Sequence, residues 1–152
     1  MSRKMLYLII LALVLTTWSF AQAIDNGYQK LIDDFFALYV KGEPVQALDQ
    51  LYATNPWIKS NPDDVAKVKS GLSGLSSLVG EYISHDLLET EQLGPRFVDV
   101  EYVVNCDRQP LRFHFQFYKP RDKWVTHYFG YNSDLEDWLT EKARNKVIFE
   151  LH

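Results

Sequence analysis

Three polar side chains in the second half of the chain alternate with apolar residues, which is the pattern of strands with one buried face. They are His85, Tyr102 and His127. An imidazole can accept a proton near neutral pH, and a tyrosine hydroxyl can donate a hydrogen bond to a developing oxyanion. A His85 or His127 base with Tyr102 as the oxyanion donor would therefore suit proton-transfer chemistry.

The same side chains also suit two roles without catalysis. Together with Tyr39 and Trp57 from the first half of the chain, they are candidates to line a ligand pocket. Alternatively, each is a core residue whose polar atom has found one hydrogen-bond partner, as buried polar groups usually do. We favour the core interpretation and keep the pocket as the alternative.

Motifs of other chemistries are missing from the sequence. It contains no glycine-rich phosphate loop, no Gly-x-Ser-x-Gly elbow and no His-Glu-x-x-His helix. His114 is expected to point away from His85 and His127, so no converging set of metal ligands is predicted. Cys106 is the only cysteine, which excludes an internal disulfide. We expect no cofactor.

The N-terminus has the order of a secretory signal peptide. The basic pair Arg3-Lys4 precedes an apolar run over residues 5–15, and Ala21-Gln22-Ala23 offers small residues before a cleavage site. The apolar run is shorter than the roughly twenty residues of a membrane-spanning helix. We therefore predict removal of residues 1–23, with no membrane anchor in the product.

The predicted mature chain, residues 24–152, has the size and charge of one acidic domain. Loss of Arg3 and Lys4 leaves 14 basic residues against 20 acidic ones, a net charge of minus six. The basic residues are scattered among acids, so we expect no nucleic-acid partner. The periplasm is the predicted destination, with the extracellular space as the alternative.

Helical periodicity dominates the first part of the mature chain. Apolar residues recur at spacings of three and four over residues 24–41, and Gly42 suits a left-handed cap after them. Pro44 begins a second predicted helix, which Asn55-Pro56 ends. A third helix is predicted over residues 62–79.

The pattern then changes to the alternation of strands. Strands are predicted over residues 82–88, 96–104, 111–118 and 124–131, followed by a short helix capped by Ser133 and a short strand over 146–151. In one register of the second and third strands, apolar residues pair on one face and opposite charges pair on the other. This register sets Val100 opposite Phe113, Val98 opposite Phe115, Glu101 opposite Arg112 and Asp99 opposite His114. Opposite charges would then face each other across the strands, and each such pair would stabilise the sheet by about 0.2–1 kcal/mol.

These elements predict an α+β fold, with three N-terminal helices on one face of a curved antiparallel sheet of about four strands and a short C-terminal helix. Four segments carry a family resemblance: the opening helix around Phe35, Tyr39, Lys41 and Gly42, then residues 47–52, 113–117 and 124–129. In these segments the chain resembles the nuclear transport factor 2-like (cystatin-like) superfamily, specifically its small exported bacterial members without an assigned function. Residues 24–152 would form one such domain.

The resemblance implies a cone-shaped cavity between sheet and helices, and no particular chemistry. Isomerases and cyclases of the superfamily use a buried carboxylate to move a proton, but here Glu89 is the nearest candidate, and Asp99 and Glu101 are predicted to point outward. We therefore expect an exported, non-catalytic binding domain for a small apolar or amphipathic molecule or a protein partner. The alternatives are an isomerase or hydratase, and a subunit that dimerises through the sheet.

Overall fold

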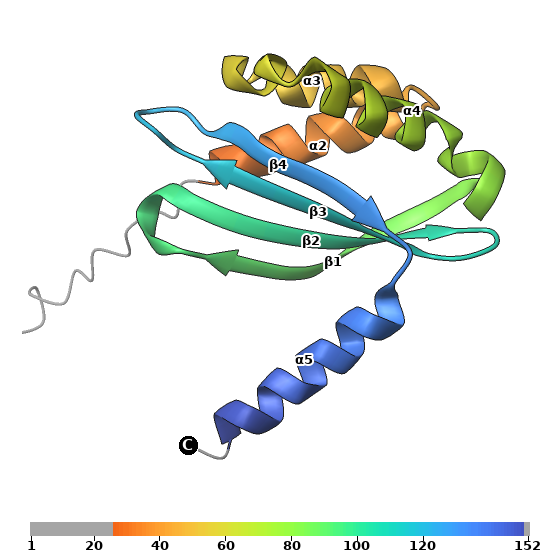
Figure 1. Cartoon of the computed structure of the whole chain (residues 1–152), viewed down its shortest axis with the longest axis vertical. Coiled ribbons are helices and arrows are strands. Elements are labelled where there is room, and N and C mark those ends of the chain that lie inside the picture. The colour runs from red at the N-terminus through yellow and green to blue at the C-terminus, as the bar shows by residue number, and fades with distance from the viewer. Residues whose placement is uncertain (1–25, 151–152) are drawn as a thin grey trace, which may run out of the picture.

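The protein is described by a computed structural model over residues 26–150, with side chains described through Arg144. The predicted signal peptide, residues 1–23, lies outside this range. The helices α2, α3 and α4 cover one side of an antiparallel sheet, and α5 lies on the other side (Figure 1). The α+β fold is therefore confirmed. Over residues 26–150, no helix is long and apolar enough to cross a membrane.

The helical layer consists of α2 (Gly27–Tyr39), α3 (Pro44–Ala53) and α4 (Pro62–Val79), with the 3₁₀ helix η1 (Pro56–Ser60) between the last two. Gly42 follows α2 with a φ of 78°, the left-handed conformation predicted for it. Pro44 and Pro62 occupy the first turns of their helices, where a missing backbone N–H costs no hydrogen bond.

The sheet consists of β1 (Tyr82–Gln92), β2 (Phe97–Cys106), β3 (Leu111–Tyr118) and β4 (Val125–Asn132), and the 3₁₀ turn η2 (Gly94–Arg96) joins the first two. The strands lie in chain order, so β1 and β4 are the edges. β1 is longer than predicted because its pairing with β2 continues to Gln92 opposite Val98.

Phenylalanine rings fill the space between the middle of the sheet and α2. Phe113, Phe115 and Phe117 of β3 are completely buried. The Phe35 ring of α2 lies 5.3 Å from the Phe115 ring and 5.1 Å from the Phe129 ring, measured between centroids. The region in which a cone-shaped cavity was expected thus holds the aromatic centre of the core.

The pairing of β2 with β3 differs by two residues from the predicted register. Val100 lies opposite Phe115 instead of Phe113. A shift of two residues leaves every side chain on its predicted face, because strand faces alternate with a period of two. The prediction of the faces is therefore confirmed, and the prediction of the pairs is wrong.

The predicted charge pairs form diagonally in this register. Glu101 lies opposite His114, yet its Oε1 accepts a hydrogen bond of 2.9 Å from Arg112 Nη1. His114 Nε2 lies 2.8 Å from Asp99 Oδ2. Long side chains reach diagonal neighbours across a strand pair, so charge complementarity does not distinguish the two registers.

The C-terminal region is one continuous helix, α5 (Leu135–Glu150). The prediction of a short strand over residues 146–151 is therefore wrong for residues 146–150. Leu151 lies outside the described residues. A helix satisfies its own backbone groups, whereas a strand requires a paired neighbour that a local alternating pattern cannot supply. Lys142 of α5 forms an ion pair with Glu89 of β1.

Two glycines within α4 make a matched pair for a stability test. Gly74→Ala should raise the free energy of unfolding by about 0.5–1 kcal/mol, since alanine is the better helix former and a Cβ there would meet no atom within 4 Å. At Gly71 a Cβ would overlap the Tyr131 hydroxyl, so Gly71→Ala should lack this gain. Urea denaturation of both variants measures the difference. Equal stabilisation would contradict the packing of Tyr131 against α4.

Candidate functional site

The structure separates the five predicted site residues into two groups. His85, Tyr102 and Tyr39 surround the Phe36 ring of α2 at the β1 side of the core. The His85 ring is stacked on Phe36, with centroids 3.7 Å apart and an interplanar angle of 4°. The Tyr102 and Tyr39 rings lie 5.2 Å and 6.5 Å from the same ring.

Each residue of this first group is held by core contacts. The Tyr82 hydroxyl and His85 Nδ1 form a hydrogen bond of 2.7 Å, and burial lowers the pKa of His85, so its neutral form is favoured. The hydroxyl of buried Tyr102 accepts a bond of 3.1 Å from Gln29 Nε2. Burial raises the pKa of Tyr39 to about 12, so its hydroxyl stays protonated. These contacts agree with the core interpretation.

His127 does not lie with Tyr102. It occupies a register shift between β3 and β4, where Phe117 pairs with Thr126 and Gln116 pairs with Tyr128, so His127 is the additional residue of a bulge. Its exposed side chain contacts Phe97, with ring centroids 5.6 Å apart. Tyr102 is instead buried in the core, so His127 and Tyr102 do not form the predicted pair of base and oxyanion donor. The rings of the other candidate base, His85, and of Tyr102 lie 5.7 Å apart.

His127 and Trp57 line a groove beside the edge strand β4. This β4 groove has a volume of about 740 Å³ and lies between η1, the first half of α4 and residues 127–131. Its apolar walls include Tyr52, Ile58, Val65, Val68, Tyr128 and Tyr131. Trp57 is 81% exposed, although a large aromatic ring is usually well buried in a folded domain.

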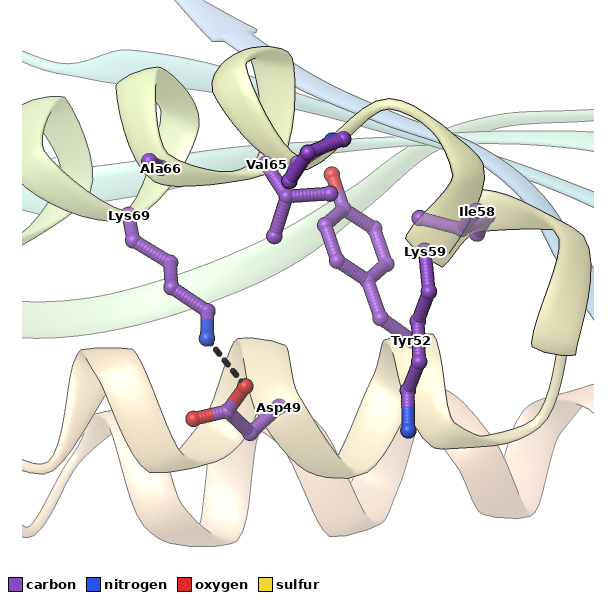
Figure 2. Close-up of a pocket in the computed structure, with 8 residues that line it drawn as sticks. Asp49, Tyr52, Ile58, Lys59, Val65, Ala66 and Lys69 are labelled. Atoms are coloured by element: carbon purple, nitrogen blue, oxygen red, sulfur yellow. Dashed lines mark ion pairs between the residues drawn. The ribbon is translucent and has the colours of Figure 1, made fainter.

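A second cavity adjoins the β4 groove between α3 and α4 (Figure 2). Its volume is about 350 Å³, and it shares Tyr52, Ile58 and Val65 with the larger groove. Lys69 and Asp49 form an ion pair at its side. Burial raises the pKa of Tyr52 to about 12, which keeps its hydroxyl protonated between the two cavities.

Hydrogen bonds between the end of α3 and the start of β4 position the groove. The backbone N–H of buried Thr126 donates to Thr54 Oγ1 at 2.9 Å, and its hydroxyl donates to the Leu51 carbonyl at 2.9 Å. Asn55 Nδ2 donates to the Thr126 carbonyl at 2.8 Å, while its Oδ1 accepts from the Trp57 N–H at 3.1 Å. Asn55, predicted only as a helix end, therefore directs η1 and places Trp57 at the rim.

The groove combines apolar walls with a polar rim. Asn61, Asp64 and Lys67 contribute this rim from the end of η1 and the first turns of α4. Binding sites for small molecules typically occupy about 300–1,000 Å³ and have mostly apolar walls with a few polar groups. Tyr52 and Val65 lie in helices that periodicity predicted, but the periodicity of one helix does not show that the two residues border a cavity.

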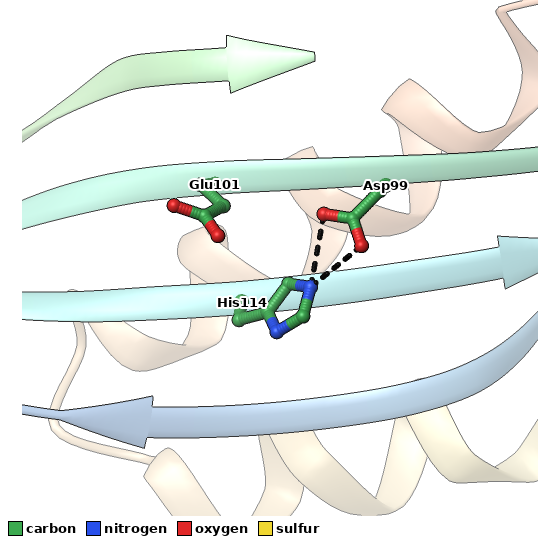
Figure 3. Close-up of side chains that lie close together, drawn as sticks. All are labelled: Asp99, Glu101 and His114. Carbon is green, nitrogen blue, oxygen red and sulfur yellow. Dashed lines mark hydrogen bonds and ion pairs between the residues drawn. The ribbon is translucent and has the colours of Figure 1, made fainter. Parts of the chain in front are cut away.

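A polar cluster lies on the opposite face of the sheet (Figure 3). Asp99 and Glu101 of β2 and His114 of β3 each offer a ligand atom, and these atoms lie within 4.8 Å of one another. Alternation predicted that all three would point away from the core, and this is confirmed. The pairing of Asp99 with His114 was predicted. The approach of Glu101 to the same two residues was not, because Glu101 was predicted to lie opposite Arg112 and lies opposite His114.

Comparisons of the chain with protein-family models, with curated proteins and with solved structures find no match.

Proposed function

We propose that this protein is an exported, non-catalytic domain that binds a small amphipathic molecule in the β4 groove. The observation that carries the proposal is the 81% exposed Trp57 at the rim of a largely apolar groove of about 740 Å³. An exposed tryptophan beside such a cavity provides a flat apolar surface that a ligand can cover. The resemblance to the nuclear transport factor 2-like superfamily stays a prediction, and the proposal does not depend on it.

The lining residues define the kind of molecule that fits. Tyr52, Ile58 and Val65 offer an apolar surface that continues into the adjoining cavity, which suits an aliphatic or aromatic body. Asn61, Asp64 and Lys67 at the rim suit a polar end group, and Lys67 can pair with an anionic one. Burial of apolar area contributes about 25 cal/mol per Å², so the apolar body supplies most of the affinity and the rim selects orientation.

Binding of 1-anilinonaphthalene-8-sulfonate tests the groove, since this probe has an apolar aromatic body and an anionic end. Trp57→Ala should weaken binding by about tenfold, because stacking and area burial of one aromatic side chain contribute on the order of 1–3 kcal/mol. The variant should unfold within about 0.5 kcal/mol of the wild type, since an exposed side chain contributes little to the core. Fluorescence titration and urea denaturation measure the two quantities.

Trp138→Ala is the matched control, because Trp138 lies on α5, on the other side of the sheet. It should leave the affinity for the probe unchanged. Equal binding by wild type and Trp57→Ala would refute the groove as the site. Native mass spectrometry of the protein purified from its own envelope should show a bound small molecule, and its consistent absence would count against a physiological ligand.

A further inference from the structure

We propose that Asp99, Glu101 and His114 bind one divalent transition-metal ion, of the zinc type, on the sheet face opposite the helices. This site is independent of the β4 groove. It would join β2 to β3 through metal coordination, and it would leave coordination positions for solvent or a further ligand. Four observations on the described residues carry the inference.

The first observation is the convergence of the donor atoms. One ligand atom from each residue lies within 4.8 Å of the other two, and His114 Nε2 lies 2.9 Å and 2.8 Å from the two Asp99 oxygens (Figure 3). Zinc binds nitrogen and oxygen ligands at about 2.0–2.2 Å, so ligand atoms around one tetrahedral ion are about 3.4 Å apart. Small side-chain rotations would bring the three atoms to that spacing, with the metal replacing the proton between His114 and Asp99.

The second observation is a buried carboxylate oxygen without a partner. The Glu101 side chain is 12% exposed, and its Oε1 accepts a hydrogen bond from Arg112. Its Oε2 is buried and has no hydrogen-bond partner among the described residues. A buried, unpaired carboxylate oxygen is costly, and a metal ion in the cluster would satisfy it.

The third observation is an excess of negative charge on this face. Glu89 lies directly opposite Glu101, and Glu91 lies directly opposite Asp99, so two like-charged pairs join β1 and β2. Like charges directly opposite each other destabilise a strand pair. Arg112 and Lys142 each pair with one of these four carboxylates. A divalent cation would offset the two charges that remain.

The fourth observation is that neighbouring groups orient the ligands. Gln116 Nε2 donates to Asp99 Oδ2 at 2.8 Å, and Arg112 Nη1 donates to Glu101 Oε1 at 2.9 Å. These bonds leave Glu101 Oε2 and the second Asp99 oxygen for the ion. Hydrogen bonds of this kind set the direction of metal ligands in known sites. An imidazole ligand favours zinc and similar transition metals over magnesium and calcium, which prefer oxygen alone.

Titration calorimetry with zinc chloride on the tag-free protein tests the proposal. We expect one zinc ion per chain and an increase in Tm. Hydrogen-bond partners that merely orient a ligand contribute about 10–100-fold to metal affinity, so loss of a ligand should cost about tenfold or more. His114→Gln removes the imidazole and retains an amide that can donate to Asp99, and Glu101→Gln removes the second carboxylate. Both should show this loss.

Asp86→Asn is the matched control, since Asp86 is an exposed carboxylate of β1 opposite Val103 and is neither a ligand nor one of the four carboxylates named above. It should bind zinc within about threefold of the wild type, because an exposed charge at this distance is screened by solvent. Zinc affinity that is unchanged in His114→Gln, or magnesium that binds more tightly than zinc, would overturn the proposal.

Cobalt binding tests the site in the wild-type protein, so the result does not depend on whether a variant folds. Adding Co²⁺ to the wild-type protein should shift and broaden the imidazole resonances of His114 in its NMR spectrum, since a paramagnetic ion acts on the nuclei of its own ligands. The resonances of His85, which is stacked on Phe36 in the core, serve as the internal reference. Unchanged His114 resonances would overturn the proposal.

Discussion

Phe115→Ala should lower the free energy of unfolding by about 3–5 kcal/mol, the range measured for removing a buried phenylalanine ring. Phe115 is completely buried at the centre of the sheet. Its ring lies 5.3 Å from the Phe35 ring of α2 and 5.1 Å from the Phe129 ring of β4. The substitution would therefore remove contacts that join the sheet to the helical layer. Urea denaturation followed by circular dichroism measures the change.

Gln116→Ala is the control for this prediction, because the next residue of the strand points to the other face. Gln116 is only partly buried and donates one hydrogen bond, to Asp99. Its loss should cost on the order of 1 kcal/mol, the net contribution of one such bond. A larger loss for Gln116→Ala than for Phe115→Ala would refute the assignment of the two sheet faces.

Arg112→Met should lower the free energy of unfolding by about 2–4 kcal/mol in buffer that contains a metal chelator. The side chains of Arg112 and Glu101 are 18% and 12% exposed, so solvent screens their ion pair only partly. Methionine retains the apolar stem of arginine and removes the charge. Glu101 would then be left largely buried without its counter-ion, beside the like charge of Glu89. Thermal and urea denaturation measure this loss.

The double variant Arg112→Met/Glu101→Leu separates the cost of an unpaired charge from the value of the pair. Replacing both members of a largely buried ion pair by apolar residues is often neutral or stabilising. We expect the double variant to recover most of the stability lost in Arg112→Met. A double variant as unstable as the single one would mean that Arg112 contributes through contacts other than Glu101, such as the bond from its Nε to Asn132 Oδ1.

Sequence periodicity predicted the elements and their faces because both follow from local geometry. An α-helix returns to the same face every 3.6 residues and a strand every two, so the burial of Phe113 and Phe115 could be read from alternation. Gly42 marked the end of one helix and Pro44 the beginning of the next by their own backbone preferences. Leu78 shows the limit of this approach, since it lies three residues after buried Leu75, at the spacing of one helix face, yet is exposed, while Val79 is buried.

The register of β2 and β3 depended on contacts between distant parts of the chain. The connection between these strands is anchored to the end of α4: Arg108 N–H donates to the Val79 carbonyl at 2.9 Å, and Asp107 N–H donates to the Glu81 carbonyl at 3.1 Å. These bonds hold the connection between Val104 and Leu111, the last paired residues of the two strands, at a length that sets Val100 opposite Phe115. The sequence shows the charges that can pair across the strands, but not which of two registers the connection permits.

In both candidate sites, the sequence predicted features of single residues, and the tertiary structure decided what surrounds them. Residue types and alternation were sufficient to place Asp99, Glu101 and His114 on the outer face of the sheet. The two-residue difference in register decided which of the two carboxylates lies directly opposite His114, and the three ligand atoms lie within 4.8 Å of one another. Trp57 was recognised as a candidate, while the cavity beside it exists because Thr54 and Asn55 join the end of α3 to Thr126 of β4.

The sequence by itself thus determined the α+β class, the order of the elements and the direction in which most strand side chains point. The tertiary structure alone decided that His85 and Tyr102 lie against Phe36 in the core, that His127 turns outward at a bulge, and that Trp57 borders a groove. The physical reason is the separation of the interacting residues along the chain. Periodicity relates residues a few positions apart, whereas register, bulges and cavities follow from contacts between residues far apart in the chain.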